Sequence, residues 1–359
     1  MFRQQKNGWI GIDIGSATVK VAQLAQFDGK LRIIARAIVP RSAPEISEDA
    51  ETENESRWSA SGEIGAAVAL AGGLRGRQAA LTMPMGLCDI HHLDSLSDVS
   101  DDLDSVVRRA VETATQASAE HLQFDLWPAE SVDGKDQPLR WNVMAVARPW
   151  SDQLYWDVVK NGFACQRIDG LPHSLARAVG LGLPTPLTLP VATLDWGSSQ
   201  ATFCIVQDGS PVYARMLKDC GLDRIMCSLA QGLGIRTEQA YGLLSRYGLS
   251  GLKSRNADEM AVLVAELIKE PLNQLEHELS RTISYVNGLR RSIKPQQVYV
   301  FGGGGLIRGV TNYLTRQLKI ESRVWGLNPD PSVYDSSECE NQCLFGPALA
   351  LSALAWENA

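Results

Sequence analysis

The segment Ile12-Asp13-Ile14-Gly15-Ser16 decides the fold, because the chain repeats it as Leu194-Asp195-Trp196-Gly197-Ser198. In each copy an apolar run ends in an aspartate, and a Gly-Ser pair follows after one further residue. A second apolar, β-branched run comes next and leads to an Asp-Gly pair, Asp28-Gly29 in the first copy and Asp208-Gly209 in the second. Internal similarity of this kind indicates a chain built from two related halves.

The spacing within the two copies supports the repeat. The aspartates of the two segments are 182 residues apart and the Asp-Gly pairs are 180 residues apart, so the copies have nearly the same length. An Asp-Gly pair between two strand-like runs is a strong signal for a type I′ hairpin, because both central residues of that turn need a positive φ. The sequence therefore predicts an α/β fold with two halves, each opening with a hairpin that has Asp-x-Gly-Ser in its first turn.

A third element is a run of four glycines, Gly302–Gly305, which follows the β-branched segment Val298–Phe301 and leads into a helix-like stretch. Glycines let a backbone approach a ligand closely. The amide groups at a helix N-terminus are a common anion site. We expect this element to contact a bound cofactor.

The composition is that of an ordinary globular protein of 359 residues, with 45% hydrophobic and 21% charged residues. This length exceeds the roughly 100–200 residues of one domain, so two domains are expected. A net charge of −7 argues against a nucleic-acid partner, which needs a clustered basic face. No apolar stretch approaches the roughly 20 residues that span a bilayer, and residues 1–9 lack the apolar core of a signal peptide. We expect a cytoplasmic protein without direct membrane insertion.

The seven cysteines are an odd number, lie mostly far apart and form no CxxC pair. This pattern predicts reduced, buried thiols. Cys339 and Cys343 have the spacing to share a helical face, but no histidine lies near them to complete a metal site. We therefore expect both to be structural.

Between these landmarks the chain is expected to be mostly helical. The predicted helical ranges are 59–74, 99–118, 154–163, 225–246 and 257–292, the last interrupted by Pro271. Residues 41–57 are polar and rich in turn-forming residues, which predicts an exposed loop. Residues 183–190 contain three prolines and are expected to form the boundary between the halves.

Two aspartates at equivalent strand ends, Asp13 and Asp195, are expected to face each other across a cleft. This arrangement suits a magnesium-nucleotide site, because Mg²⁺ keeps several waters and takes only one or two carboxylates plus phosphate oxygens. Both are candidate magnesium residues, acting through water, and the turns that follow them offer donors to phosphate. The candidate cofactor-binding residues are Asp13, Gly15, Ser16, Ala17, Thr18, Lys20, Asp195, Gly197, Ser198, Ser199, Gly302, Gly303, Gly304 and Leu306.

Two of these assignments have alternatives. Lys20 lies seven residues after Asp13 on the second predicted strand, so its ammonium group can return to the phosphates or form an ordinary surface ion pair. A Rossmann dinucleotide site is the competing interpretation of the glycine motifs. Neither Gly11–Ser16 nor the Gly302 run gives a GxGxxG sequence that opens a βαβ unit, which argues against it.

The order of these elements resembles the superfamily of actin, the sugar kinases and the heat-shock chaperones, in which they are the two phosphate motifs and the adenosine motif. Within it the chain looks most like the PilM family of type IV pilus assembly proteins. The segments that show this resemblance are Gly11–Val21, Leu81–Pro84, Asp98–Glu112, Trp141–Ala147, Ile168-Asp169, Leu175–Ala178 and Phe345–Ala350. The resemblance implies an actin-like (ribonuclease H-like) two-domain fold around a nucleotide cleft.

The resemblance also implies subdomains and a catalytic candidate. The expected subdomains are 1A in residues 1–80, 1C in 81–164, the 1A return segment and hinge in 165–190, 2A in 191–217, a mostly helical 2B in 218–294, and the second part of 2A in 295–359. Asp169 is the candidate for positioning an attacking water. The alternative is that Asp169 caps the helix Leu171–Val179.

As to function, the resemblance implies a scaffold. In the PilM family the protein binds the N-terminal cytoplasmic tail of PilN, an inner-membrane protein, in a groove that involves subdomains 1A and 1C. It implies bound ATP or ADP with Mg²⁺, other pilus or secretion assembly proteins as partners, and a location beside the inner membrane through a partner.

Two alternative functions stay open. A small-molecule kinase of the same superfamily would need a substrate pocket and an aspartate base beside the phosphates. An FtsA-like filament former would need a terminal amphipathic helix with a basic face, and residues 348–359 contain no Lys or Arg.

The sequence departs from the family pattern around the nucleotide. Tyr241 and Leu244 stand where a carboxylate and an amine are expected near the ribose, and Leu306 stands where a Lys or Arg packs on the adenine. Gln200 replaces a threonine, and Asp219-Cys220-Gly221 replaces paired glycines. These departures imply weakened or lost nucleotide affinity, and a very slow ATPase or none.

Overall fold

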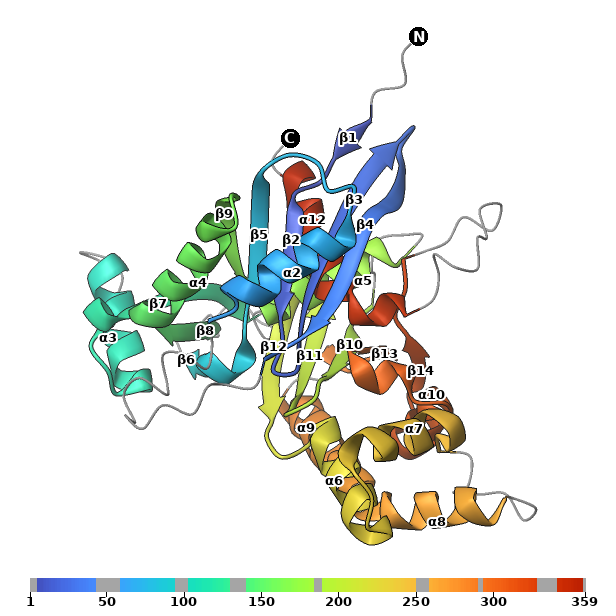
Figure 1. Ribbon diagram of the computed structural model, residues 1–359. Coiled ribbons are helices and arrows are strands. Elements are labelled where there is room, and N and C mark those ends of the chain that lie inside the picture. The colour runs from blue at the N-terminus through green and yellow to red at the C-terminus, as the bar shows by residue number, and fades with distance from the viewer. Residues whose placement is uncertain are drawn as a thin grey trace, which may run out of the picture. The chain divides into compact units, whose positions relative to one another are not determined.

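The computed structural model describes residues 5–42, 59–93, 103–129, 140–183, 189–249, 258–289, 293–327 and 341–357. The chain forms two compact units (Figure 1). The first unit comprises Met1–Ser174 and Pro347–Ala359, and the second unit comprises Leu175–Gly346. Each unit is built around a central sheet of its own.

The central sheet of the first unit has six strands in the order β1-β3-β2-β5-β9, with β4 paired to β3. The strands β2, β3 and β4 are antiparallel neighbours, and β5 and β9 continue the sheet parallel to β2. Their bounds are β1 Lys6–Asn7, β2 Ile10–Ile14, β3 Thr18–Phe27, β4 Lys30–Pro40, β5 Gln78–Met83 and β9 Ala164–Gly170. All five residues of β2 are buried, as expected of a strand covered on both faces.

The central sheet of the second unit repeats this arrangement in the order β12-β11-β10-β13-β14. The first three strands are again antiparallel neighbours, and β13 and β14 continue the sheet in parallel. Their bounds are β10 Val191–Trp196, β11 Ala201–Gln207, β12 Ser210–Leu217, β13 Gln297–Phe301 and β14 Glu321–Val324. The repeat predicted from the sequence is therefore a repeat of sheet topology.

Both predicted Asp-Gly turns are confirmed. Asp28 and Gly29 have φ values of 50° and 79°, and Asp208 and Gly209 have φ values of 50° and 77°. Positive φ at both central residues is the requirement of a type I′ turn. These turns join β3 to β4 and β11 to β12.

Helices cover both faces of the first unit's central sheet. On one face, Ile10, Ile12 and Ile14 pack with Ile64 of α2 (Ser61–Ala71) and Leu154 of α4 (Arg148–Lys160). Alternate residues of a strand point to opposite faces, so Gly11 and Asp13 lie on the other face. That face is covered by α12 (Gly346–Ala353).

The position of α12 corrects one expected boundary. Gly11 leaves room for the helix, because a Cβ atom there would overlap the Ala348 carbonyl group. The backbone N–H of Leu24 donates to Ser352 Oγ (2.9 Å), and that of Trp9 donates to the Ser352 carbonyl oxygen (3.0 Å). The sequence analysis placed residues 295–359 in the second half. The last part of this range, residues 347–359, belongs to the first unit. The units also divide after Ser174, ahead of the expected hinge at 183–190, of which residues 184–188 lie outside the described residues.

A three-stranded antiparallel sheet is inserted between β5 and β9 in the order β6-β8-β7. Its elements are β6 Asp89–Leu93, α3 Leu103–Thr115, β7 Leu122–Ala129 and β8 Arg140–Ala147. It has a core of its own, in which Val111 of α3 packs with Leu93, Leu122, Val143 and Ala145. We call this the small sheet.

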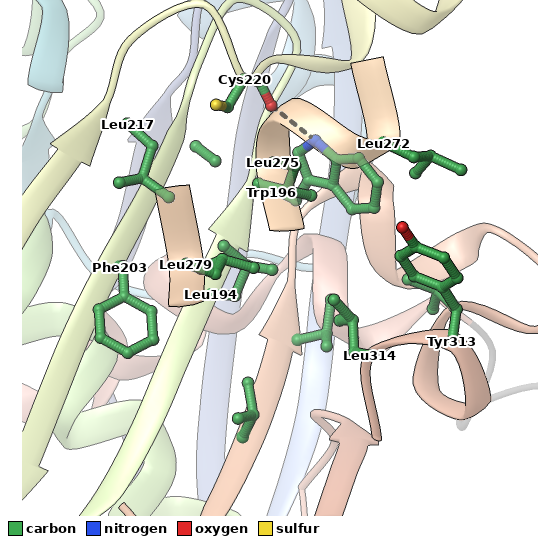
Figure 2. Packing of buried hydrophobic residues seen from close by; sticks show 14 of the residues in the cluster. Leu194, Trp196, Phe203, Leu217, Cys220, Leu272, Leu275, Leu279, Tyr313 and Leu314 are labelled. Atoms are coloured by element: carbon green, nitrogen blue, oxygen red, sulfur yellow. Dashed lines mark hydrogen bonds between the residues drawn. The ribbon is translucent and has the colours of Figure 1, made fainter. Parts of the chain in front are cut away.

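The second unit has a larger core, in which Trp196 packs with leucines of α9 (Figure 2). Trp196 donates its Nε1–H to the Cys220 carbonyl oxygen (2.9 Å). Its helices are α6 Leu222–Leu233, α7 Thr237–Tyr247, α8 Glu259–Leu267, α9 Lys269–Leu289 and α10 Val310–Leu318. Pro271 lies in the first turn of α9, where its missing N–H costs nothing, so the predicted interruption is a helix start.

The other helix predictions hold with shifted ends. The helix predicted at 154–163 begins earlier, at Arg148, where Pro149 takes an initial helical position. The helix predicted at 225–246 is two helices, because α6 ends at Leu233 and is capped by Gly234 in the left-handed conformation (φ 62°). The loop predicted at 41–57 lies outside the described residues except for residues 41 and 42.

Candidate functional site

The turns that follow the two repeated aspartates have the same geometry. In the first turn the N–H of Gly15 donates to the Thr18 carbonyl oxygen (2.9 Å). In the second turn the N–H of Gly197 donates to the Gln200 carbonyl oxygen (3.1 Å). The repeat in the sequence therefore produces two copies of one backbone turn.

Asp13 is buried, with 8% of the residue exposed, and its carboxylate is held by two side chains of the same unit. Lys20, directly opposite Asp13 in the β2–β3 register, donates from Nζ to Asp13 Oδ2 (2.8 Å). Thr82 of β5 donates from Oγ1 to Asp13 Oδ1 (2.9 Å). Lys20 therefore forms an ion pair, as the alternative had it, but the pair is nearly buried and not on the surface. Contact of Lys20 with phosphate stays a prediction.

Lys20 also lies beside the first turn. A Cβ atom on Gly15 would be 3.6 Å from Lys20 Nζ, so the ammonium group sits next to the turn backbone. A cation and a tight turn placed together suit an anionic phosphate group. Because both oxygens of Asp13 already accept hydrogen bonds, Mg²⁺ would fit this carboxylate through a water molecule. The residues present therefore fit the expected cofactor, and contact of Ser16, Ala17 and Thr18 with it stays a prediction.

Asp169 lies near the end of β9, where its strand partner is Thr82. The parallel strands β2, β5 and β9 therefore present Asp13, Thr82 and Asp169 at one edge of the sheet, where ligands bind in open α/β sheets. The carboxylate of Asp169 is 4% exposed, accepts a hydrogen bond from Ser174 Oγ (3.2 Å) and lies 3.8 Å from Arg167 Nε.

Ser174 belongs to α5 (Leu171–Leu181), the helix that Asp169 precedes. The Asp169 carboxylate is therefore bonded to α5, the helix that it was expected to cap in the alternative interpretation. The bond comes from the Ser174 hydroxyl group. A role of Asp169 in positioning water stays a prediction.

The small sheet reaches this edge of the first unit. Trp127 of β7 packs against His173 of α5, with ring centroids 4.6 Å apart. Met144 of β8 lies against Gly170, the residue after Asp169, where a Cβ atom would be 2.5 Å from the methionine Cε. The inserted sheet and the Asp169 segment therefore pack together.

The second turn differs from the first in its side chains. Thr202 stands opposite Asp195 at the place that Lys20 occupies opposite Asp13. Ser198 Oγ lies 2.5 Å from Asp223 Oδ1, and the N–H of Asp223 donates to the Ser198 carbonyl oxygen (2.9 Å). The Ser198 hydroxyl group thus bonds to a carboxylate of the same unit, and its expected contact with phosphate stays a prediction.

The glycine run is explained by packing within the second unit. Gly302 has φ 71°, and a Cβ atom there would lie 2.7 Å from Asp195 Oδ1. A Cβ atom on Gly304 would overlap the Trp196 side chain, and one on Gly305 would lie 2.9 Å from Cys343 Sγ. The run thus brings the strand end of β13 directly against Asp195.

The stretch after the glycines is not the helix that was expected. Gly303–Leu306 forms a short 3-10 turn, and α10 begins only at Val310. Gly303 and Leu306 are half-buried. The expected anion site at a helix N-terminus directly after the glycines is therefore absent from this described segment.

Two residues where the sequence departs from the PilM pattern have different surroundings. Tyr241 is 56% exposed on α7, whereas Leu244 of the same helix is buried in the core of the second unit. Leu244 therefore has a packing role.

Five of the six described cysteines are buried or half-buried, but Cys227 is exposed, which corrects the prediction for that residue. Burial raises the pKa of Cys88 and Cys204 to about 12, so these thiols stay protonated. Cys339 lies outside the described residues. Among the described residues no group of three or more His, Cys, Asp or Glu side chains could hold a metal ion.

Thr82, Ser174 and Asp223 are site residues that the sequence analysis did not identify. Thr82 lies in a segment that resembles the PilM family, but nothing in that pattern showed its hydroxyl bonded to Asp13.

The helices within the described ranges include none that is long and apolar enough to cross a membrane.

Comparison with known proteins shows the fold. No family model matches the chain, and no curated protein matches its sequence. A chain of the PilM–PilN type IV pilus biogenesis complex superposes with a TM-score of 0.75 at 16% identity, covering 98% of this chain and 99% of that one. The ethanolamine utilization protein EutJ from Carboxydothermus hydrogenoformans gives a TM-score of 0.53 at 14% identity, covering 98% and 91%. MreB5 of Spiroplasma citri bound to ADP gives a TM-score of 0.51 at 12% identity, covering 95% of this chain and 94% of that one. The chain has the actin-like α/β fold.

Proposed function

We propose that this chain is a cytoplasmic, actin-like nucleotide-binding scaffold of a type IV pilus assembly complex or a related secretion complex. In this role it binds the N-terminal cytoplasmic tail of a PilN-like inner-membrane protein. This partner and other assembly proteins keep the scaffold beside the inner membrane. The observation that supports this function best is the fold shared over nearly the whole length of both chains with the PilM–PilN complex.

Strands that pair on one side only can offer main-chain partners to an extended peptide; among the described residues of the first unit they include β4 and β9 of the central sheet and two strands of the small sheet. Among the described residues, its edge strands β6 and β7 each pair with β8 alone. An extended peptide that adds to a sheet edge gains affinity from main-chain hydrogen bonds and specificity from side-chain pockets. We therefore assign binding of the membrane protein's tail to the first unit, at or beside this sheet.

The nucleotide part of the proposal depends on the first turn. Lys20 beside the Gly15 turn offers a positive charge to the phosphates of ATP or ADP, and Asp13 and Asp195 are the candidates for holding hydrated Mg²⁺. When bound, Mg²⁺ would neutralise phosphate charge.

Turnover is expected to be very slow or absent. Phosphoryl transfer to water needs a residue that orients the attacking water. The Asp169 carboxylate, the candidate for this task, is nearly buried and already bonded to Ser174. We infer that the nucleotide acts mainly as a bound ligand.

A binding experiment with the full chain tests the scaffold function. A fluorescent peptide with the N-terminal tail sequence of a PilN-like protein from the same assembly system should bind saturably in an anisotropy titration. A scrambled peptide of the same composition should not bind. Absence of saturable binding, together with ATP consumption that depends on a small metabolite, would contradict the scaffold and favour the kinase alternative. Nucleotide-dependent sedimentation as filaments would favour the FtsA-like one.

A further inference from the structure

The start of α6 closes over the second turn. The N–H groups of Leu222 and Asp223 donate to the carbonyl oxygens of Gly197 (3.0 Å) and Ser198 (2.9 Å). Gly221 is needed for this approach, because a Cβ atom there would overlap the backbone of Ser198 and Ser199. The first turn of α6 and the second turn of the repeat therefore form one rigid structure.

Within this structure the hydrogen of the Ser198 hydroxyl group is committed. An ionised carboxylate only accepts hydrogen bonds, so Ser198 must be the donor to Asp223 Oδ1 across the 2.5 Å separation. A hydrogen bond from a hydroxyl group to a carboxylate is stronger than one between two neutral groups. The lone pairs of the Ser198 oxygen remain, and they can only accept.

This arrangement decides which ligand group the second turn accepts. A phosphate oxygen is itself an acceptor, so it would meet the lone pairs of Ser198 and the negative charge of Asp223. A water molecule bound to Mg²⁺ is a strong donor, and the positive charge behind it suits both groups. The first turn is different, because Lys20 lies beside it and supplies a positive charge.

We propose that Asp223 is a specificity-determining residue, which makes the second turn select a magnesium-complexed nucleotide over a free one. The inference rests on the proposed nucleotide binding and deepens it. Asp223 acts through the Ser198 hydroxyl group and through its own charge.

The test compares the affinity for ADP with Mg²⁺ and with EDTA, measured by calorimetry on the full chain. In the wild type, free ADP should bind much more weakly than Mg-ADP. Asp223→Asn keeps an acceptor for Ser198 but removes the charge, so free ADP should bind roughly tenfold more tightly, while Mg-ADP binding stays the same or weakens. The ratio of the two affinities should therefore fall.

Asp208→Asn is the matched control. Asp208 belongs to the same unit, is exposed in the turn between β11 and β12, and has a positive φ that asparagine tolerates. The same change of net charge there should leave the ratio unchanged. A circular dichroism melt of each variant establishes that the fold is kept.

Three results would overturn the inference. An unchanged ratio in Asp223→Asn, with normal binding by the wild type, would remove Asp223 from ligand selection. Equal changes in Asp223→Asn and Asp208→Asn would reduce the effect to overall charge. If neither the wild type nor any variant binds ADP under either condition, the nucleotide part of the proposed function is itself wrong.

Discussion

At the residue scale, Asp13 of β2 and Lys20 of β3 form a nearly buried ion pair beside the first turn. Their side chains are only 11% and 12% exposed, and their charged atoms are 2.8 Å apart. Taking a charge out of water is costly unless a partner compensates it. Thr82 satisfies the second oxygen of Asp13, so the carboxylate has a fixed orientation without any ligand.

Replacing Lys20 should therefore cost more stability than replacing an exposed lysine. We expect Lys20→Met to lower the free energy of unfolding by about 2–4 kcal/mol, because it leaves a nearly buried carboxylate without its counter-charge. Urea denaturation measures this value. Lys30→Met is the control, since Lys30 is exposed at the start of β4, and it should change stability by less than about 0.5 kcal/mol.

Adding Asp13→Asn to Lys20→Met should recover part of the loss, because the unpaired charge is then gone. Equal stability of Lys20→Met and Lys30→Met would show that the Asp13–Lys20 pair is solvated, contrary to this account.

At the element scale, the junction of β13 with the glycine run is set by close packing. Gly302 combines a left-handed φ of 71° with a Cβ position 2.7 Å from Asp195 Oδ1 and 2.8 Å from the Trp196 carbonyl oxygen. A left-handed φ is strained for any residue with a side chain, and both contacts are too close for a Cβ atom. The Trp196 carbonyl oxygen belongs to the backbone and cannot rotate away. The strand end of β13 therefore depends on glycine for both conformation and space.

Two Gly→Ala substitutions should consequently have opposite effects. Gly302→Ala should destabilise the protein by about 1–3 kcal/mol and displace the Asp195 carboxylate. Gly242→Ala, in α7 with nothing within 4 Å of the new methyl group, should stabilise it by about 0.5–1 kcal/mol. Thermal unfolding followed by circular dichroism gives the two signs. Two losses of similar size would mean that Gly302 is not under the constraint described.

At the scale of the whole molecule, each unit has its own sheet and its own core, and each has one of the repeated turns. Asp13 belongs to the first unit and Asp195 to the second. The proposed nucleotide binding can therefore be tested in each unit separately, through that unit's own aspartate.

Mg-ADP should accordingly raise the melting temperature of the wild type by mass action. At a ligand concentration of 100 Kd the stabilisation is about 2.7 kcal/mol. Asp13→Asn and Asp195→Asn should each lose this gain relative to their own ligand-free state. Asp28→Asn, in the exposed β3–β4 turn where asparagine tolerates a positive φ, should keep it. Equal gains in all four proteins would remove both aspartates from the site.

The sequence by itself determined the features that follow local rules. The repeated Asp-x-Gly-Ser segments and the Asp-Gly turns were predictable, because a positive φ restricts the residue type at those positions whatever surrounds them. The actin-like fold followed from the order of these segments. Asp13 and Lys20 were also identified from sequence as candidates, since each stands near a landmark of the repeat, and Asp169 was a candidate through the resemblance to the PilM family.

Only the tertiary structure decided which of these residues meet. The bond from Thr82 to Asp13 joins residues 69 positions apart, that from Ser198 to Asp223 joins residues 25 apart, and that from Leu24 to Ser352 joins residues 328 apart. Such contacts depend on how strands and helices pack, and no local preference encodes them. For this reason the sequence predicted a second-half position for α12, whereas packing placed the helix on Gly11, and the bond between Ser198 and Asp223 was visible only in the structure.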